Sequence, residues 1–155
     1  MLKPLITLAF LLSIGGCTTT DYGNYSGALP GYSQAMATDT ANHLAKLYPP
    51  ALTRWNMGQP TTDAYGASLV VALRARGYSV AEYAQENARV VPTQPSTTLA
   101  SNKPGLDLRY IVDDLSTTAA LYRVTLIAGQ QSLSRAYTPK KGGTVAAAGS
   151  WSRKE

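Results

Sequence analysis

The sequence holds very little cysteine, histidine or phenylalanine, each of which occurs once among 155 residues. A single cysteine, Cys17, cannot form a disulfide within the chain, so the fold has to be held by its own hydrophobic core. A single histidine, His43, excludes a multi-histidine metal site, and any Ser-His-Asp arrangement would have to use it. His43 falls on the polar side of a predicted helix, where we expect a solvated side chain. We therefore predict no metal site.

Charge is also sparse, because Asp, Glu, Lys and Arg together make up 15% of the residues. The formal net charge of +5 is spread along the chain, and its densest points are the short pairs Lys140-Lys141 and Arg153-Lys154. Nucleic-acid-binding domains usually concentrate their basic residues in one stripe or patch. We therefore expect no direct binding of nucleic acid. Ten tyrosines against one phenylalanine indicate surfaces that are partly apolar yet wet.

Two short motifs match catalytic or ligand-binding patterns only in part. Asp113 and Asp114 are adjacent, and neighbouring residues of a strand point to opposite faces, which favours a turn entry over a general acid/base pair. Gly142-Gly143-Thr144 follows two lysines, but the full GxxxxGK[ST] phosphate-binding pattern is absent and a hairpin turn fits better. The sequence therefore predicts no catalytic residue and no cofactor, and the chain is not expected to be an enzyme.

The start of the chain has the three parts of an export signal. Lys3 supplies a basic start, residues 5–12 form an apolar stretch, and small residues precede Cys17. The apolar stretch is roughly half the length of about 20 residues that a membrane-spanning helix needs. Ile14-Gly15-Gly16-Cys17 resembles the lipobox of a bacterial lipoprotein, in which the cysteine becomes the acylated first residue of the mature chain.

This resemblance implies that residues 1–16 are cleaved and that Cys17 carries a diacylglyceryl group, with an acyl chain such as palmitate on its amine. Each buried methylene contributes about 0.8 kcal/mol, so several chains on one residue make a permanent anchor. The alternative is an ordinary secretory signal with a cysteine at its boundary by coincidence. Thr18, in place of an aspartate, favours the outer membrane, with the domain facing the periplasm.

Residues 17–32 are polar and rich in Gly, Ser and Tyr, which predicts a flexible lipid-anchored tether. Two interpretations of Tyr22, Tyr25 and Tyr32 stay open: they dock onto a partner subunit, or they are incidental to a spacer. The remaining residues, 33–155, have a length that suits a single periplasmic domain with a substantial core.

Hydrophobic periodicity in 33–155 predicts helices first and strands afterwards. One helix is expected over 33–47, and a second, capped by Thr61 or Thr62, ends at Gly77. The residues 84–104, which hold several prolines, are expected to form a long loop. Strands are expected at 52–57, 78–83, 106–113, 122–127 and 133–137, then a turn over 139–143 and a last strand carrying Val145 and Trp151. The predicted fold class is α+β, with two helices packed on one face of a small antiparallel sheet.

Four segments of the C-terminal half, taken together, resemble the TrbH family of conjugal transfer lipoproteins. They are Leu108 to Asp113, Leu121 to Leu126, Gln131 to Tyr137 and the closing Gly149 to Glu155. The predicted helix over 64–77, followed by Tyr78-Ser79-Val80, agrees with the family as well. Together with the lipobox, the resemblance covers the chain from about Leu44 onward plus the leader.

The resemblance implies a structural subunit of a type IV secretion system, the mating-pair-formation apparatus that moves DNA and protein between cells. Its partners would be the core-complex subunits of the channel, in a symmetric hetero-oligomer, and the outer-membrane bilayer through lipid on Cys17. Cys17 is the one site residue that the resemblance transfers. We also expect the sheet edge left by the last strand to pair with a partner strand. The alternative function is a free-standing periplasmic binding or inhibitor lipoprotein of the cell envelope.

Overall fold

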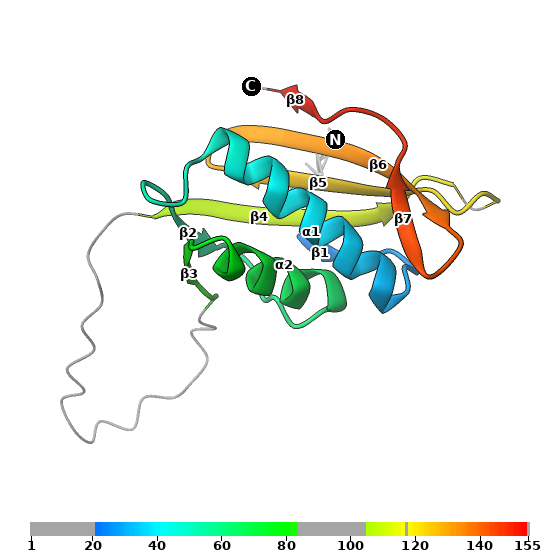
Figure 1. Cartoon of the computed structure of the whole chain (residues 1–155), viewed down its shortest axis with the longest axis horizontal. Helices are drawn as coiled ribbons and strands as arrows, with labels where there is room; N and C mark the ends of the chain where they lie inside the picture. The colour runs from blue at the N-terminus through cyan, green and yellow to red at the C-terminus, as the bar shows by residue number, and fades with distance from the viewer. Residues whose placement is uncertain (1–20, 84–104, 117, 155) are drawn as a thin grey trace, which may run out of the picture.

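A computed structural model describes residues 21–83, 105–116 and 118–154, in which two helices lie across one sheet (Figure 1). The predicted leader, Cys17 and the predicted loop 84–104 lie outside the described residues. In chain order the elements are β1 (Gly23–Asn24), α1 (Pro30–Leu47), β2 (Arg54–Met57), α2 (Ala64–Ala75), β3 (Ser79–Ala81), β4 (Leu106–Asp114), β5 (Tyr122–Ala128), β6 (Gln131–Lys140), β7 (Thr144–Ala147) and β8 (Ser152–Lys154). Both helices precede the long strands, and the predicted α+β class is confirmed.

The sheet is mixed, so the expectation of a purely antiparallel sheet is wrong. Its strands run in the order β3-β2-β4-β5-β6-β7, with β1 also on β4 and β8 also on β6. The strands from β4 to β8 pair antiparallel as predicted, whereas β1 and β2 are parallel to β4, and β3 is parallel to β2. The reason is connectivity: α1 follows β1 and α2 follows β2, and a helix that recrosses the sheet brings the next strand back in the same direction.

Each helix begins where local chemistry satisfies its first turn. α1 begins at Pro30 instead of residue 33, because proline lacks the N–H that a first turn leaves unpaired. α2 is capped by Asp63, whose Oδ1 accepts the backbone N–H groups of Tyr65 and Gly66 at 3.0 Å each. The predicted cap at Thr61 or Thr62 is therefore wrong. The Asp63 carboxylate has a further advantage over a threonine hydroxyl, because its negative charge complements the positive end of the helix dipole. Gly77 ends the helix at φ +86°, as predicted.

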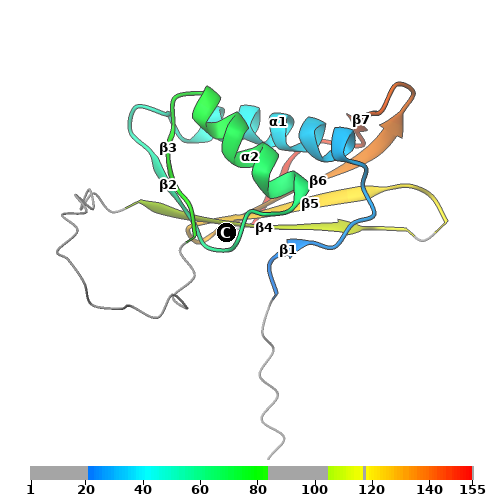
Figure 2. The same cartoon turned by 90° about the horizontal axis from the view of Figure 1, so that it is seen from below.

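The hydrophobic core lies between the two helices and one face of the sheet (Figure 2). The strands predicted at 106–113 and 122–127 are confirmed, and every second residue faces the core: Leu108, Tyr110 and Val112 of β4 are fully buried together with Val124 and Leu126 of β5. α1 contributes Met36, Ala37, Ala41 and Leu44, and α2 contributes Tyr65, Leu69, Val70, Ala72 and Leu73. No described helix covers the opposite face of the sheet (Figure 2).

Three of the largest buried side chains are tyrosines whose hydroxyl groups all have partners. Tyr65 pairs with the hydroxyl of Thr40 at 2.9 Å, Tyr110 donates to Asp63, and Tyr137 donates to Asp39 at 2.7 Å. Burial is the main cause that raises the pKa of each phenol, and for Tyr110 and Tyr137 the hydrogen bond to a carboxylate is the second. These phenols therefore stay neutral. The contact of Tyr65 joins the two helices, and those of Tyr110 and Tyr137 join the helical layer to the sheet.

The end of the chain forms two strands where one was predicted. β7 and β8 both pair with β6, and Trp151 lies in the connection between them. Pro139 and Lys140 belong to β6, so the turn is shorter than the predicted 139–143 and covers residues 141–143. Gly142 and Gly143 in this turn have φ +90° and +75°. The outer side of β4 is thus shared by β1 and β2, and the outer side of β6 by β7 and β8.

Candidate interaction surfaces

The N-terminal segment is part of the folded domain from residue 21 onward. β1 pairs with Ile111 and Val112 of β4, and the N–H of Tyr25 donates to the Val112 carbonyl at 2.7 Å. The N–H of Gly27 donates to Asp114 Oδ2 at 3.2 Å. The expected tether over 17–32 is therefore wrong for 21–32, because the free side of β4 offers backbone groups that this segment satisfies.

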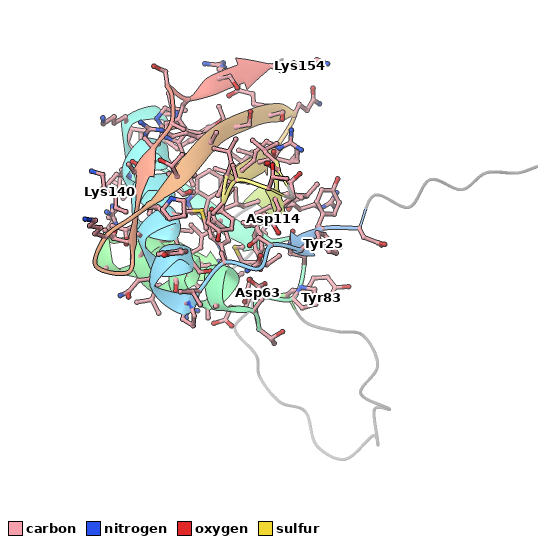
Figure 3. The ribbon with its side chains drawn as sticks, turned by 90° about the vertical axis from the view of Figure 1, so that its right-hand side faces the viewer. Tyr25, Asp63, Tyr83, Asp114, Lys140 and Lys154 are labelled. Carbon is pink, nitrogen blue, oxygen red and sulfur yellow. The ribbon has the colours of Figure 1, made fainter. Side chains whose placement is uncertain are left out.

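The three tyrosines of this segment have different roles. The guanidinium carbon of Arg109 lies over the Tyr22 ring, 5.1 Å from the ring centroid. The ring centroids of Tyr32 and Tyr122 are 5.9 Å apart. Both therefore contact their own domain. Tyr25, labelled in Figure 3, is 57% exposed, although its backbone N–H is bonded to β4. Of the three, Tyr25 is the one that a partner would reach.

A cluster of polar and aromatic side chains joins α1 to the C-terminal segment. Arg135 Nη1 is 2.9 Å from Asp39 Oδ2, and its Nε donates to the Gly149 carbonyl at 2.8 Å. The Arg135 guanidinium also lies 5.9 Å from the centroid of the Trp151 ring, which stacks on His43 at 4.7 Å and 9° between the planes. No sequence motif indicates this cluster. The signal for it in the sequence is Arg135, a charged residue on the same face of the strand as Leu133 and Tyr137, which are buried.

His43 is half-buried in this cluster, which corrects the expectation of a solvated side chain. Burial is the main cause that lowers the pKa of His43, and Lys46 and Arg135 lower it further, while Asp39 acts in the opposite direction. A neutral imidazole stacked on an indole is an apolar contact. His43 therefore packs the C-terminal segment onto α1.

The helical face carries two open grooves. One, of about 420 Å³, lies between α1 and α2 and is lined largely by small side chains, with Val71 67% exposed beside it. Arg76 crosses its end and donates to the Ala72 carbonyl and to Asn42 of α1. The other, of about 530 Å³, lies between α1 and the start of β7. Both are open surfaces suited to a macromolecule more than to a small enclosed ligand.

The two weak catalytic patterns have structural roles. Asp113 pairs with Arg123 across the β4–β5 ladder, while Asp114 accepts from Gly27, so the two carboxylates serve different partners. Gly142 and Gly143 form the turn between β6 and β7, as the hairpin interpretation predicted. Within 21–83, 105–116 and 118–154, no three His, Cys, Asp or Glu side chains gather as a metal site would require. In the same ranges no helix has the length and apolarity to cross a membrane.

These features define a small α+β domain whose recognisable surfaces are sheet edges and open grooves. The chain belongs to the TrbH family: the family model described as conjugal transfer protein TrbH matches residues 19–155. No curated protein and no solved structure matches the chain. Membership confirms the resemblance and extends it to the N-terminal segment. Family membership assigns the chain a role in conjugation and type IV secretion, and it indicates an association with the cell envelope. The family is not a known enzyme family.

Proposed function

We propose that this chain is a non-catalytic structural subunit of a mating-pair-formation channel, anchored to the outer membrane by lipid on Cys17 and facing the periplasm. Its protein partners are the core-complex subunits of the channel, within a symmetric hetero-oligomer. Family membership supports the conjugative role. The lone cysteine after Ile14-Gly15-Gly16 supports the anchor.

The observation that carries this proposal is how soon after Cys17 the chain joins the sheet. Asp21, the first described residue, follows Cys17 by four positions, and four extended residues reach at most about 14 Å. β1 then pairs with β4, a central strand of the sheet. An acylated Cys17 would therefore hold the domain close to the bilayer, and a fixed position suits a brace in an assembly better than a search for distant ligands.

The anchor is tested by Cys17→Ser, with Thr18→Ser as the matched control that keeps the cysteine. Both full-length variants are expressed in donor cells that lack the native copy. We expect Cys17→Ser protein to move from the detergent phase to the aqueous phase and the frequency of conjugal transfer to fall, while Thr18→Ser changes neither. Undiminished transfer by a fully aqueous Cys17→Ser protein would contradict the role of the anchor.

Partner capture separates the structural role from the alternative of a free-standing envelope lipoprotein. The lipidated protein is purified under mild detergent from cells that carry the whole transfer apparatus. Recovery of core-complex subunits in fixed proportion is the expected result. Recovery of murein alone, or of one soluble periplasmic protein, would assign the chain to the alternative class.

A further inference from the structure

We propose that the groove between α1 and β7 binds an extended segment of a partner protein, about five residues long, which adds a strand to the outer edge of β7. This deepens the proposed function, and it rests on that function only for the origin of the segment, a subunit of the channel. The groove and its free strand edge are properties of the domain itself.

The groove has one helical wall and one strand wall. Its helical wall is the face of α1 from Gly31 to Asn42, and its strand wall runs from Gly143 to Val145. A Cβ added to Gly31 would lie 2.6 Å from the Gly143 carbonyl oxygen, so the two walls meet at that end. Asp39, bonded to Arg135 and Tyr137, lies in the lining farther along. The result is a polar groove that is closed at one end.

The register of β7 directs backbone groups away from β6. Pro139 lies opposite Val145, and because proline has no N–H this pair cannot exchange two hydrogen bonds. Hydrogen-bonded and non-bonded pairs alternate along an antiparallel ladder, so Ala147, opposite Tyr137, is non-bonded as well. The bond from the Ala148 N–H to the Ala136 carbonyl, at 2.8 Å, agrees with this alternation. The N–H and C=O groups of Val145 and Ala147 therefore point to the outer edge, where another extended backbone can bind them.

The other described edges are less suited to a partner strand. β1 has two residues, and β8 consists of exposed residues that include Arg153 and Lys154. At β3, Arg74 donates to the Val80 carbonyl at 3.3 Å and forms an ion pair with Glu82. Charged side chains and short length are common protections of an edge strand. β7 reads Thr-Val-Ala-Ala and carries no charge.

Length and charge specify the segment. From Gly31 to Asn42 the helical wall rises about 16 Å at 1.5 Å per residue, which equals about five residues of extended chain at 3.3 Å.

Asp39 and Arg135 neutralise each other, so the open end favours uncharged side chains. At the closed end Lys140 and Lys141 are exposed, and neither pairs with a described carboxylate. The first turn of α1 adds positive potential there. The segment therefore carries an acidic residue at that end.

The test uses the full mature chain in detergent and a phage-displayed library of random ten-residue peptides. We expect enriched peptides to contain an acidic residue, to bind the chain, and to slow amide hydrogen exchange in the segment that contains β7. Ala35→Leu fills the groove, and Ala147→Pro removes an outward N–H, so each should weaken binding about tenfold. Ala67→Leu, the same change in the α1–α2 groove, and Ala147→Ser, which keeps the N–H, should leave binding unchanged.

Charge is tested by Lys140→Glu, with Lys154→Glu on β8 as the control at a separate place on the surface (Figure 3). Lys140→Glu should weaken binding severalfold at low salt, and Lys154→Glu should not.

The proposal is overturned if no peptide is enriched, or if Ala35→Leu, shown to be folded by its thermal denaturation, binds as the unchanged chain does. It is also overturned by a concentration-dependent dimer that protects β7, since that would assign the groove to a second copy. If peptides bind the groove as expected but partner capture recovers no core-complex subunit, the groove is upheld and the role in the channel is refuted.

Discussion

Gly66→Ala tests a close approach between α2 and the sheet. A Cβ on Gly66 would overlap the hydroxyl oxygen of Tyr110 and would lie 2.9 Å from the Cα of Thr61. α2 cannot move away freely, because the Gly66 N–H donates to the Asp63 cap, and the same Asp63 accepts the Tyr110 hydroxyl. The substitution therefore strains one small region that contains the helix cap, the helix and a central strand.

Two effects of opposite sign compete in this variant. Alanine is favoured over glycine in a helix interior by up to about 1 kcal/mol, and less in the first turn, where Gly66 lies. Against this, overpacking a well-filled core costs about 1–3 kcal/mol, and a lost hydrogen bond to a carboxylate about 1.5–3 kcal/mol. The steric effect prevails, and we expect the free energy of unfolding to fall by about 2–4 kcal/mol.

The assay is urea denaturation followed by the fluorescence of Trp55, which is fully buried. With a urea slope of about 2 kcal/mol per molar, the midpoint should fall by roughly 1–2 M. Ser68→Ala, on the same helix, should stay within about 0.5 kcal/mol of the unchanged chain. In the double variant with Tyr110→Phe the missing hydroxyl should relieve part of the clash, so the two losses should not add. A Gly66→Ala midpoint that is unchanged or raised would refute the close approach.

The remaining predictions concern the cluster around Arg135. Asp39→Asn removes the charge paired with Arg135 and weakens the acceptor of Tyr137; because the Asp39 side chain is 36% exposed, we expect a loss of only about 1–2 kcal/mol, measured by thermal denaturation. Since burial lowers the pKa of His43 below 6.5, its contribution to the free energy of unfolding is complete above about pH 6.5 and falls as pH drops from there toward the folded-state pKa. His43→Gln should remove that part of the pH dependence between pH 5 and 8, and an NMR titration of His43 with a midpoint at or above 6.5 would contradict the argument.

The strands and the ends of the helices differ in how well the sequence predicts them. Leu108, Tyr110 and Val112 alternate with less buried residues over a long stretch, and burial on one face of a sheet requires that alternation. The predicted cap of α2 at Thr61 or Thr62 is wrong because threonine and aspartate are both good caps, and only the fold shows which side chain reaches the first N–H groups. Gly77, at positive φ, was correctly identified because few other residues adopt that conformation after a helix.

Long-range pairing was the part that local patterns could not supply. β1 is a two-residue strand without alternation, and it exists because β4 leaves backbone groups unpaired beyond the end of β2. The contact of Arg135 with Asp39 joins residues 96 positions apart, which no periodicity encodes. The outward direction of the Val145 and Ala147 backbone groups is equally non-local, because it depends on the position of Pro139 in a ladder that only the fold reveals.

The first described residues and the groove lie on different sides of the sheet. Figure 2 shows the first described residues leaving β1 on the side away from the helices, whereas α1 and β7 lie on the helical side. Because Asp21 lies within about 14 Å of Cys17 along an extended chain, acylation of Cys17 would place the helix-free side toward the bilayer. The groove would then open away from the lipid, where an extended segment of a channel subunit can enter it without crossing the membrane surface. In that arrangement, anchoring through Cys17 and binding of a segment to β7 are independent. Cys17→Ser should therefore abolish membrane association and leave the affinity for the peptide unchanged.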